Sequence, residues 1–368
     1  MSSNVTVDTF KAIRCPRISK SITEGINSLE LQDVPRVKQL KPHELRIQVY
    51  ASCVNYFDLL ITIGTYQHKP QMPYTMGSEC SGKIIECGNK VSMYKIGDSV
   101  IIPMGGQCMA AEVVVDERIV IRKPDTLSYT QSAAIGVGFM TGYHALVHRG
   151  RIQQGDYLLV TGAGGGMGLA AVQLGRALGA IVIGAASSDE KCRIAAQYGA
   201  HHTINYSTGK FKDQIEKITQ KKLIQVCYDP VGGDIFTECI RCMAPNGRLL
   251  IIGFASGNIP NIKANMVLVK GFDVVGVRSG AEMMRDPSIA ADMAQRLIEL
   301  TSVEHLENGG WDIAPVVSQS YFWLTDDWKN AWRLVNQRQI IGKAAVKWHA
   351  DADKIPEVRK NIKTNSKM

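Results

Sequence analysis

Short runs of apolar residues, some of them alternating with polar ones, recur through the first third of the chain. Residues 45–51 alternate with a period of two, which is typical of a half-buried strand. Further strand-like runs, separated by turns that contain glycine, proline or Asn-Lys, lie at residues 10–15, 82–87, 99–102 and 111–115. A short helix is expected between Asn55 and Gly64. Short strands with such turns predict a small β-rich domain up to about residue 138.

From about residue 139 the pattern changes to apolar strands that alternate with helices. Strands are expected at residues 156–160, 181–186, 202–205, 225–229, 248–253 and 272–277. This alternation predicts an α/β fold with a parallel, doubly wound sheet, which binds ligands at the carboxyl ends of its strands. Beyond residue 278 we expect a helix near residues 290–300 and a last strand at residues 344–348.

A glycine-rich turn follows the first strand of this alternating region and precedes a helix. It contains Gly162, Gly165, Gly166, Met167 and Gly168, and its spacing Gly-x-x-Gly-x-x-Gly is a variant of the dinucleotide fingerprint Gly-x-Gly-x-x-Gly. Glycines let backbone N–H groups approach a phosphate, and the helix N-terminus adds partial positive charge. The strand, turn and helix together predict a site for the pyrophosphate of a dinucleotide.

Composition narrows the class of protein. The chain has 368 residues, enough for two domains, and its 45% hydrophobic and 21% charged content is ordinary for a globular protein. No apolar run of about 18 residues occurs, so no membrane partner is expected. The net charge of +8 is spread along the chain, which suits an anionic cofactor or substrate but predicts no nucleic-acid partner.

The cysteines give little sign of chemistry of their own. There are nine of them at irregular spacing, and no signal peptide is recognised, which predicts reduced thiols in an intracellular protein. Cys239 and Cys242 form the single Cys-x-x-Cys motif, on a predicted helix with no second ligand pair nearby. Buried helical cysteines are therefore favoured over a metal or redox site.

Several motifs together resemble the medium-chain dehydrogenase/reductase superfamily. They are the segments 77–82 and 97–100 with Gly88 between them, the glycine turn, the segments 229–233 and 253–257, and Gly342-Lys343. The resemblance covers nearly the whole chain and is closest to the zinc-free quinone oxidoreductase branch. It implies a GroES-like domain at residues 1–138 that residues 278–368 complete, a Rossmann domain at residues 139–277, and a homodimer.

Two departures from the zinc-dependent members of that superfamily bear on the chemistry. By resemblance, Asn55 stands where those enzymes have a cysteine ligand, and Ser78 stands where they have a histidine ligand. Zinc favours thiolate, imidazole and carboxylate ligands over an amide or a hydroxyl. The loop with four clustered cysteines that holds their structural zinc is missing as well. We therefore expect no metal, and hydride transfer from a reduced nicotinamide to a polarised double bond is the chemistry that remains.

The end of the second strand of the alternating region predicts which nicotinamide is used. An NAD-selective domain has an acidic residue there, whereas this strand ends in small neutral residues, followed by Ser187 and, one helical turn on, Lys191. Ser187 and Glu190 also have the spacing of a capping box, which predicts a structural role for them. In the resembling quinone reductases, residues that match Lys191, Tyr206 and Arg338 bind the 2′-phosphate. We therefore predict NADPH.

The resemblance also implies residues close to the reacting groups. It assigns cofactor contacts to Asn55, Thr141, Gly253, Phe254 and Ala255. Tyr66 matches a tyrosine that faces the substrate in quinone reductases and donates a proton in related enoyl-thioester reductases. A well-placed phenol of this kind contributes about 10²–10⁴-fold to a rate. Tyr66 and Asn55 are the predicted catalytic residues, although a tyrosine that only packs in the turn stays an alternative.

The sequence thus predicts an NADPH-dependent, zinc-free reductase of a small quinone or similar conjugated carbonyl compound. An enoyl-CoA-type thioester reductase and a non-catalytic NADPH-binding protein stay open as alternatives. The chain ends in Ser366-Lys367-Met368, which resembles the Ser-Lys-Leu signal for peroxisomal import. The cytoplasm is the default location, and a peroxisome-type organelle is the alternative.

Overall fold

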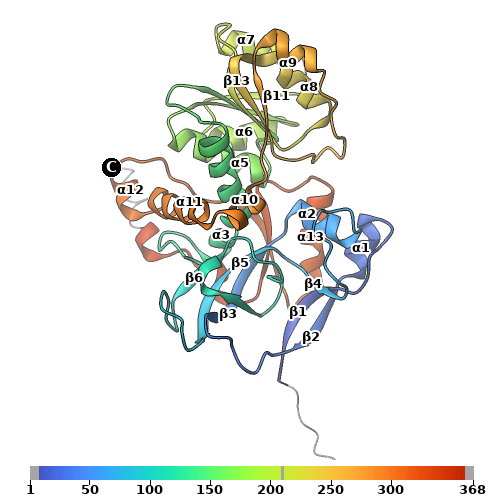
Figure 1. Ribbon diagram of the computed structural model, residues 1–368, viewed down its shortest axis with the longest axis vertical. Coiled ribbons are helices and arrows are strands. Elements are labelled where there is room, and N and C mark those ends of the chain that lie inside the picture. The colour runs from blue at the N-terminus through green and yellow to red at the C-terminus, as the bar shows by residue number, and fades with distance from the viewer. Residues whose placement is uncertain (1–7, 209–210, 361–368) are drawn as a thin grey trace, which may run out of the picture. The chain divides into compact units, whose positions relative to one another are not determined.

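The structure, a computed structural model, describes residues 8–208 and 211–360. The chain forms two compact units, one from the described parts of Met1–Val137 and Val317–Met368 and the other from Gly138–Val316 (Figure 1). The C-terminal tripeptide with its predicted import signal lies outside the described residues. No described helix is long and apolar enough to cross a bilayer.

The first unit is built mainly from strands. One sheet has the order β2-β1-β4, and a second has the order β15-β16-β3-β5-β6-β8, with β7 also paired to β3. The strands are β1 (Thr9–Cys15), β2 (Glu30–Pro35), β3 (Glu44–Cys53), β4 (Tyr74–Thr75), β5 (Glu79–Cys87), β6 (Ser99–Ile102), β7 (Glu112–Asp116), β8 (Ile121–Arg122), β15 (Val317–Phe322) and β16 (Lys343–Lys347). The helices are α1 (Ile22–Ser28), α2 (Tyr56–Thr62), α3 (Tyr129–Ala133) and α13 (Lys329–Asn336).

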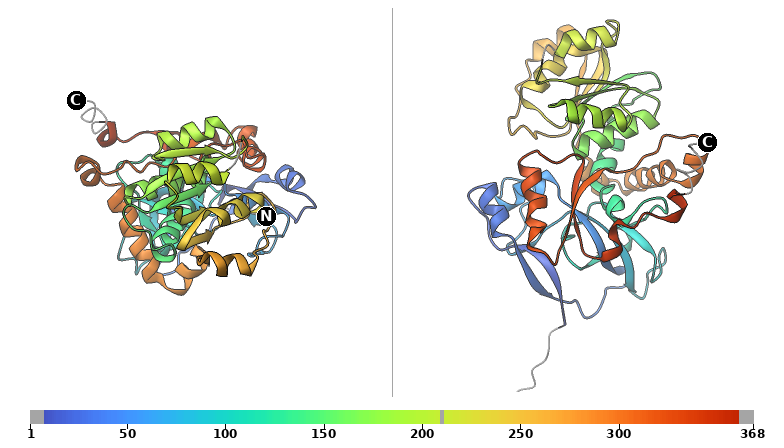
Figure 2. Two further views of the ribbon diagram at one scale, coloured as in Figure 1. Left: turned by 90° about the horizontal axis from the view of Figure 1, so that it is seen from above. Right: turned by 180° about the vertical axis from the view of Figure 1, so that it is seen from behind.

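The two ends of the chain meet in this first unit. β16 pairs antiparallel with β3, with Val346 opposite Ser52, and Figure 2 shows the red C-terminal strands from behind. Trp332 of α13 is fully buried and packs edge-on against Trp328 at a ring-centroid distance of 5.7 Å. The aromatic residues of the C-terminal segment thereby complete a core that the N-terminal strands begin.

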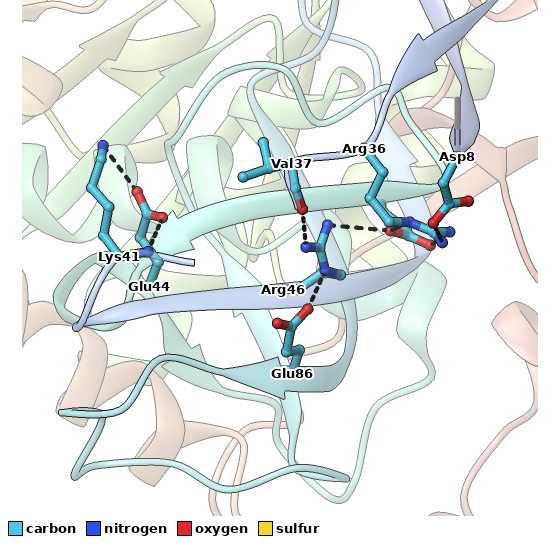
Figure 3. A network of polar contacts seen from close by, with 8 residues as sticks. Asp8, Arg36, Val37, Lys41, Glu44, Arg46 and Glu86 are labelled. Carbon is cyan, nitrogen blue, oxygen red and sulfur yellow. Dashed lines mark hydrogen bonds and ion pairs between the residues drawn. The ribbon is translucent and has the colours of Figure 1, made fainter. Parts of the chain in front are cut away.

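A network of ion pairs ties the N-terminal strands of the first unit together (Figure 3). Arg46 of β3 is nearly buried, donates to Glu86 of β5 at 2.7 Å and lies 3.7 Å from Glu112 of β7. Arg36, after β2, binds the same Glu112 and also Asp8. Because a buried guanidinium needs carboxylate and carbonyl partners, these pairs fix the register of four strands around Arg46.

The second unit contains a six-stranded sheet with the order β11-β10-β9-β12-β13-β14, and every pairing in it is parallel. Its strands are β9 (Tyr157–Thr161), β10 (Ile181–Ala186), β11 (His202–Asn205), β12 (Ile224–Asp229), β13 (Met243–Ile251) and β14 (Asp273–Gly276). The predicted doubly wound parallel sheet is therefore confirmed. The order reverses next to β9, which places the ligand-binding edge after this strand.

Helices connect these strands and continue beyond the sheet. They are α4 (Thr141–Tyr143), α5 (Gly166–Ala177), α6 (Asp189–Gln197), α7 (Phe211–Ile218), α8 (Gly233–Cys242), α9 (Ala264–Lys270), α10 (Ser279–Arg285), α11 (Pro287–Leu300) and α12 (Val303–Glu307). Residues 278–316, which the expected boundaries assigned to the first domain, group with the second unit. The reason is local, because α10 and α11 follow β14 directly and pack with the helical segment before β9.

All nine cysteines are free thiols, and most are buried. Cys239 and Cys242 lie on α8 with no side-chain exposure, as predicted. Burial raises the pKa of the Cys242 thiol to about 12, so this residue stays protonated at neutral pH. The two cysteines therefore belong to the packing of α8 against the sheet.

Candidate functional site

The glycine turn of the second unit has the geometry of an anion-binding loop. β9 ends at Thr161, Gly162 has a φ of +59°, and α5 begins at Gly166 with Gly165 as its N-cap. A Cβ atom on Gly168 would lie 2.2 Å from the carbonyl oxygen of Gly162. Only glycine therefore allows the first turn of α5 to approach the turn so closely.

The N-terminus of α5 is left without a side-chain cap. Gly166, Met167 and Gly168 occupy its first three positions, where backbone N–H groups have no acceptor within the helix. These donors and the helix dipole favour a bound phosphate. The sequence-predicted residues of the turn thus fit the pyrophosphate of a dinucleotide.

Asp229, at the end of β12, holds the neighbouring loop in place and was not singled out from the sequence. Its buried carboxylate accepts from Thr161 Oγ1 at the end of β9 and from the backbone N–H groups of Val231 and Gly232 at 3.0 and 3.1 Å. Burial raises the pKa of Asp229, while these donors oppose the rise. The signal was available, since an acidic residue ends an apolar strand directly before Pro-Val-Gly-Gly.

The end of β10 differs from the prediction in one detail. The N-cap of α6 is Ser188, whose hydroxyl accepts from the N–H of Lys191 at 3.3 Å, so the predicted capping by Ser187 is wrong. The helix begins one residue later than the capping-box spacing with Glu190 requires. Ser187 is exposed at the strand end and is not used as the cap.

Lys191 lies directly beside the glycine turn. A Cβ atom on Gly164 would be 2.6 Å from the Cβ of Lys191. The acidic side chain closest to the strand end, Asp189, accepts a hydrogen bond from Asn205 Nδ2 at 2.7 Å. The end of β10 therefore has Lys191 nearby, and the carboxylate of Asp189 is hydrogen-bonded to the side-chain amide of Asn205.

The remaining predicted cofactor residues of the second unit are distributed around the sheet. Tyr206 donates its backbone N–H to the carbonyl of Ala186 at the end of β10, and its side chain lines a cavity of about 590 Å³ over α7 and α8. Gly253, Phe254 and Ala255 follow β13, where the N–H of Ala255 binds the carbonyl of Pro230. Thr141 opens α4 and is partly buried.

Arg338 belongs to the other unit. It follows α13, is exposed and has a φ of +57°. Its sequence-predicted partners in phosphate binding, Lys191 and Tyr206, are in the second unit.

In the first unit, Asn55 stands at the N-cap of α2 inside a buried polar cluster. Its Nδ2 donates to Glu79 Oε1 at 2.9 Å, and its Oδ1 accepts from Lys343 Nζ. Lys343 also binds Glu79 Oε1 at 2.7 Å, and the other carboxylate oxygen accepts from the N–H of Val137 at 2.7 Å. Three segments far apart in the sequence thus meet at Asn55.

Asp58 and Ser78 extend this cluster. Asp58 is fully buried, and it accepts from the backbone N–H of Asn55 at 2.8 Å and from Ser78 Oγ at 3.0 Å. Burial raises the pKa of Asp58 to about 7, although both hydrogen bonds and the charge of Lys343 oppose the rise. The carboxyl group of Asp58 therefore titrates near neutral pH.

Tyr66 lies in the turn after α2. Its ring stacks on Phe57 of α2 at a centroid distance of 5.1 Å and an interplanar angle of 18°. The ring is partly buried against the core of the first unit. Tyr66, the predicted proton donor, therefore packs directly on α2, the helix whose N-cap is Asn55.

Sequence reasoning assigned no role to Glu79 or Lys343 of this cluster. A faint signal existed, because each is a charged residue in an apolar strand segment that carries a family motif. Among the described residues, no three His, Cys, Asp or Glu side chains are grouped as metal ligands would be. The side chains of Asn55 and Ser78 are instead held by Glu79, Lys343 and Asp58.

Comparison with known protein families agrees with both units. Residues 41–153 match the alcohol dehydrogenase GroES-like domain, and residues 166–301 match the zinc-binding dehydrogenase family. A quinone oxidoreductase-like protein 2 homolog of Nematostella vectensis is 34% identical over 340 residues, 92% of this chain and 89% of the relative. The quinone oxidoreductase of Homo sapiens is 31% identical over 300 residues, 81% of this chain and 87% of the relative.

Solved structures share the same fold. Escherichia coli quinone oxidoreductase in complex with NADPH has a TM-score of 0.79 at 22% identity, with 92% of this chain and 99% of that chain covered. The CurK enoyl reductase has a TM-score of 0.78 at 23% identity and the same coverage. The protein is therefore an oxidoreductase with a GroES-like and a Rossmann-type unit, and it belongs to the quinone oxidoreductase branch of the medium-chain dehydrogenase/reductase superfamily.

Proposed function

We propose that the protein is a zinc-free, NADPH-dependent reductase of quinones or similar conjugated carbonyl compounds. The observation that carries the proposal is the glycine turn, where α5 begins without a cap beside a strand end that offers Ser187 and Lys191. A hydroxyl and a lysine suit the 2′-phosphate of NADPH, whereas an acidic residue at the strand end would suit the ribose 2′-OH of NAD. The NADPH complex of the Escherichia coli quinone oxidoreductase agrees with this choice.

The predicted residues receive the following roles in the proposal, and Asn55 has two, one at the nicotinamide and one at the reacting atoms. The turn residues Gly162, Gly165, Gly166, Met167 and Gly168 bind the pyrophosphate, and Ser187, Lys191, Tyr206 and Arg338 bind the 2′-phosphate. The nicotinamide half is held by Asn55, Thr141, Gly253, Phe254 and Ala255. When bound, NADPH supplies the hydride. Tyr66 supplies a proton to the atom of the acceptor that becomes negative.

The absence of catalytic zinc is part of the same proposal. The Oδ1 and Nδ2 atoms of Asn55 are bonded to Lys343 and Glu79, and Ser78 Oγ is bonded to Asp58. An amide and a hydroxyl engaged in this way are poor ligands, and a buried ammonium beside them repels a dication. Elemental analysis of the purified protein tests this. One tightly held zinc per chain, with activity lost on chelation, would contradict it.

The activity itself is tested by following the loss of NADPH absorbance with quinones, enals and enoyl-CoA esters. Acceptor-dependent oxidation with quinones or enals, and little with NADH, supports the proposal. Preference for enoyl-CoA esters would make the protein a thioester reductase. Tight NADPH binding without turnover of any acceptor would make it a binding protein.

Tyr66→Phe separates the proposed proton donor from a packing role. The variant keeps the stacking on Phe57 and loses only the hydroxyl. We expect unchanged NADPH affinity and a fall in turnover of about tenfold or more on enals. Quinones should lose less, because the hydroquinone monoanion that hydride addition leaves is well stabilised and takes its one remaining proton from water. Equal rates for wild type and variant on every acceptor would remove Tyr66 from the mechanism.

We also propose a homodimer. β14 is the last strand of the six-stranded sheet, and Leu268 and Val269 of the nearby α9 are each 81% exposed. An open sheet edge next to exposed apolar side chains favours self-association. Light scattering after gel filtration gives the mass directly, and a monomer at micromolar concentration would contradict the proposal.

We propose that the protein resides in the cytoplasm, unless an import receptor recognises its C-terminal tripeptide. An N-terminal fluorescent tag on the full chain, compared with a form that lacks Ser366-Lys367-Met368, decides between the two. Puncta that become diffuse on deletion would establish import into a peroxisome-type organelle. Diffuse fluorescence of the full chain would indicate that the protein stays in the cytoplasm.

A further inference from the structure

Asn55, Glu79 and Lys343 form a closed triangle of hydrogen bonds in the first unit. Glu79 has no exposed surface, and the side chain of Lys343 is 9% exposed. Glu79 Oε1 accepts from both Asn55 Nδ2 and Lys343 Nζ, while Asn55 Oδ1 accepts from Lys343. The three residues come from the N-cap of α2, the start of β5 and the start of β16.

The charges in this triangle determine which way the amide of Asn55 faces. An ammonium can bind only the amide oxygen, and a carboxylate can bind only the amide N–H group. The reverse orientation would place N–H groups against Lys343 and an oxygen lone pair against Glu79. Burial is the largest single influence and opposes the charged form of Lys343, but the charge and hydrogen bond of Glu79 together with Cys53 and Asp58 outweigh it and raise the pKa of Lys343. The ammonium is therefore a permanent part of the triangle.

The triangle leaves one hydrogen of the amide available. Nδ2 carries two hydrogens, one of which is bound by Glu79, and no second acceptor for Nδ2 occurs within residues 8–208 and 211–360. The ammonium on Oδ1 also draws electron density from the amide, which makes the remaining N–H a stronger donor. Asn55 is buried, with 5% of its surface exposed, and it keeps one N–H group that no described residue binds.

We propose that Glu79 and Lys343 are positioning residues that lock the amide of Asn55 as a hydrogen-bond donor for a carbonyl or enolate oxygen of the reacting ligands. This proposal rests on the reductase function proposed above. Asn55 is the residue that touches the ligand, and Glu79 and Lys343 act through it. The class of acceptor follows, because a locked N–H group favours compounds with an oxygen that gains negative charge as the hydride arrives.

Kinetics of a double-mutant cycle test the lock. Removing only one charge leaves the other buried and unpaired, so the main variant is the double replacement Glu79→Gln with Lys343→Met, which removes both. We expect turnover of an enal to fall about tenfold or more, as for the loss of a positioned catalytic donor. In an Asn55→Ala background, the same double replacement should change turnover by less than about twofold, since it acts through Asn55. Equal losses in the two backgrounds would overturn the proposal.

Lys347→Met is the matched control. Lys347 lies on the same strand as Lys343 but pairs with Asp353 near the surface, at 2.6 Å and with 23% of its side chain exposed. This variant removes a lysine from β16 without touching the triangle, so its turnover should equal that of wild type. Loss of turnover in the control to the same extent as in the double variant would assign the effect to β16 as a whole.

A second measurement does not depend on activity. In a ¹⁵N-labelled chain, the Nδ2 signals of Asn55 are identified by their absence in Asn55→Ala. We expect one of the two hydrogens to exchange with deuterium slowly in wild type and rapidly in the double variant, because Glu79 holds it. Rapid exchange of both hydrogens in wild type would overturn the lock. If no acceptor is reduced, the proposed function fails while this measurement still decides the orientation of the amide.

Discussion

The two units build their parts of the candidate site in opposite ways. In the second unit, the glycine turn binds through backbone N–H groups, and the sequence contributes chiefly by leaving out Cβ atoms, as at Gly168. In the first unit, Asn55 is held by the charged side chains of Glu79 and Lys343. A backbone site is disturbed by adding atoms, whereas a side-chain site is disturbed by removing a charge.

The largest effect is expected when one charge of the buried triangle is removed. Glu79→Gln leaves the ammonium of Lys343 buried without the carboxylate that it binds, and we expect a loss of about 3–5 kcal/mol in the free energy of unfolding. Urea unfolding measures it. The control is Glu299→Gln, which breaks an exposed pair with Arg296 and should cost no more than about 1 kcal/mol. Equal losses would show that the triangle is not buried as described.

In the backbone site, the addition of one methyl group should have the next largest effect. Gly168→Ala places a Cβ atom 2.2 Å from the carbonyl oxygen of Gly162, so the turn and the first turn of α5 must separate. We expect the Kd for NADPH to rise about a hundredfold, equivalent to about 3 kcal/mol. Fluorescence titration with NADPH measures it. Gly276→Ala is the control, since its added Cβ meets nothing within 4 Å and its φ is not positive.

The glycine turn could be predicted from the sequence because all its parts are contiguous. Strand, turn and helix succeed one another between Tyr157 and Ala177, and each has its own local pattern. The lack of an acidic residue at the end of β10 could be predicted from the sequence for the same reason. The cap of α6 was misplaced by one residue, because Ser187 and Ser188 are both good N-caps and only the fold decides where the helix begins.

The triangle of the first unit could not be predicted in this way. Glu79 and Lys343 are 264 residues apart, and they meet only because β16 pairs with β3, which in turn pairs with β5. Neither residue shows its partner in a local pattern. The family resemblance indicated that both ends of the chain share a domain, but it gave no contact between these two side chains.

A smaller, pH-dependent effect is expected at Asp58 in the side-chain site. Its pKa is raised to about 7 in the folded chain, so its ionisation opposes folding, and stability is lost as the pH rises towards 7. The free energy of unfolding of wild type, relative to Asp58→Asn, should fall by about 2–3 kcal/mol between pH 5 and pH 8. Asp116→Asn is the control. The pKa of Asp116 is lowered to about 2 by Arg118, so its contribution should be constant over this range.

The smallest effect is expected where the backbone site is supplemented by a side chain. Lys191 lies beside the turn at Gly164, and we propose that it binds the 2′-phosphate of NADPH. A charge-assisted hydrogen bond contributes about 1.5–3 kcal/mol, so Lys191→Ala should weaken NADPH binding about ten- to a hundredfold. NADH lacks that phosphate, and its Kd should stay the same within about twofold. Titration of both cofactors separates the two roles of Lys191, because a residue that only supports the turn would weaken NADPH and NADH equally.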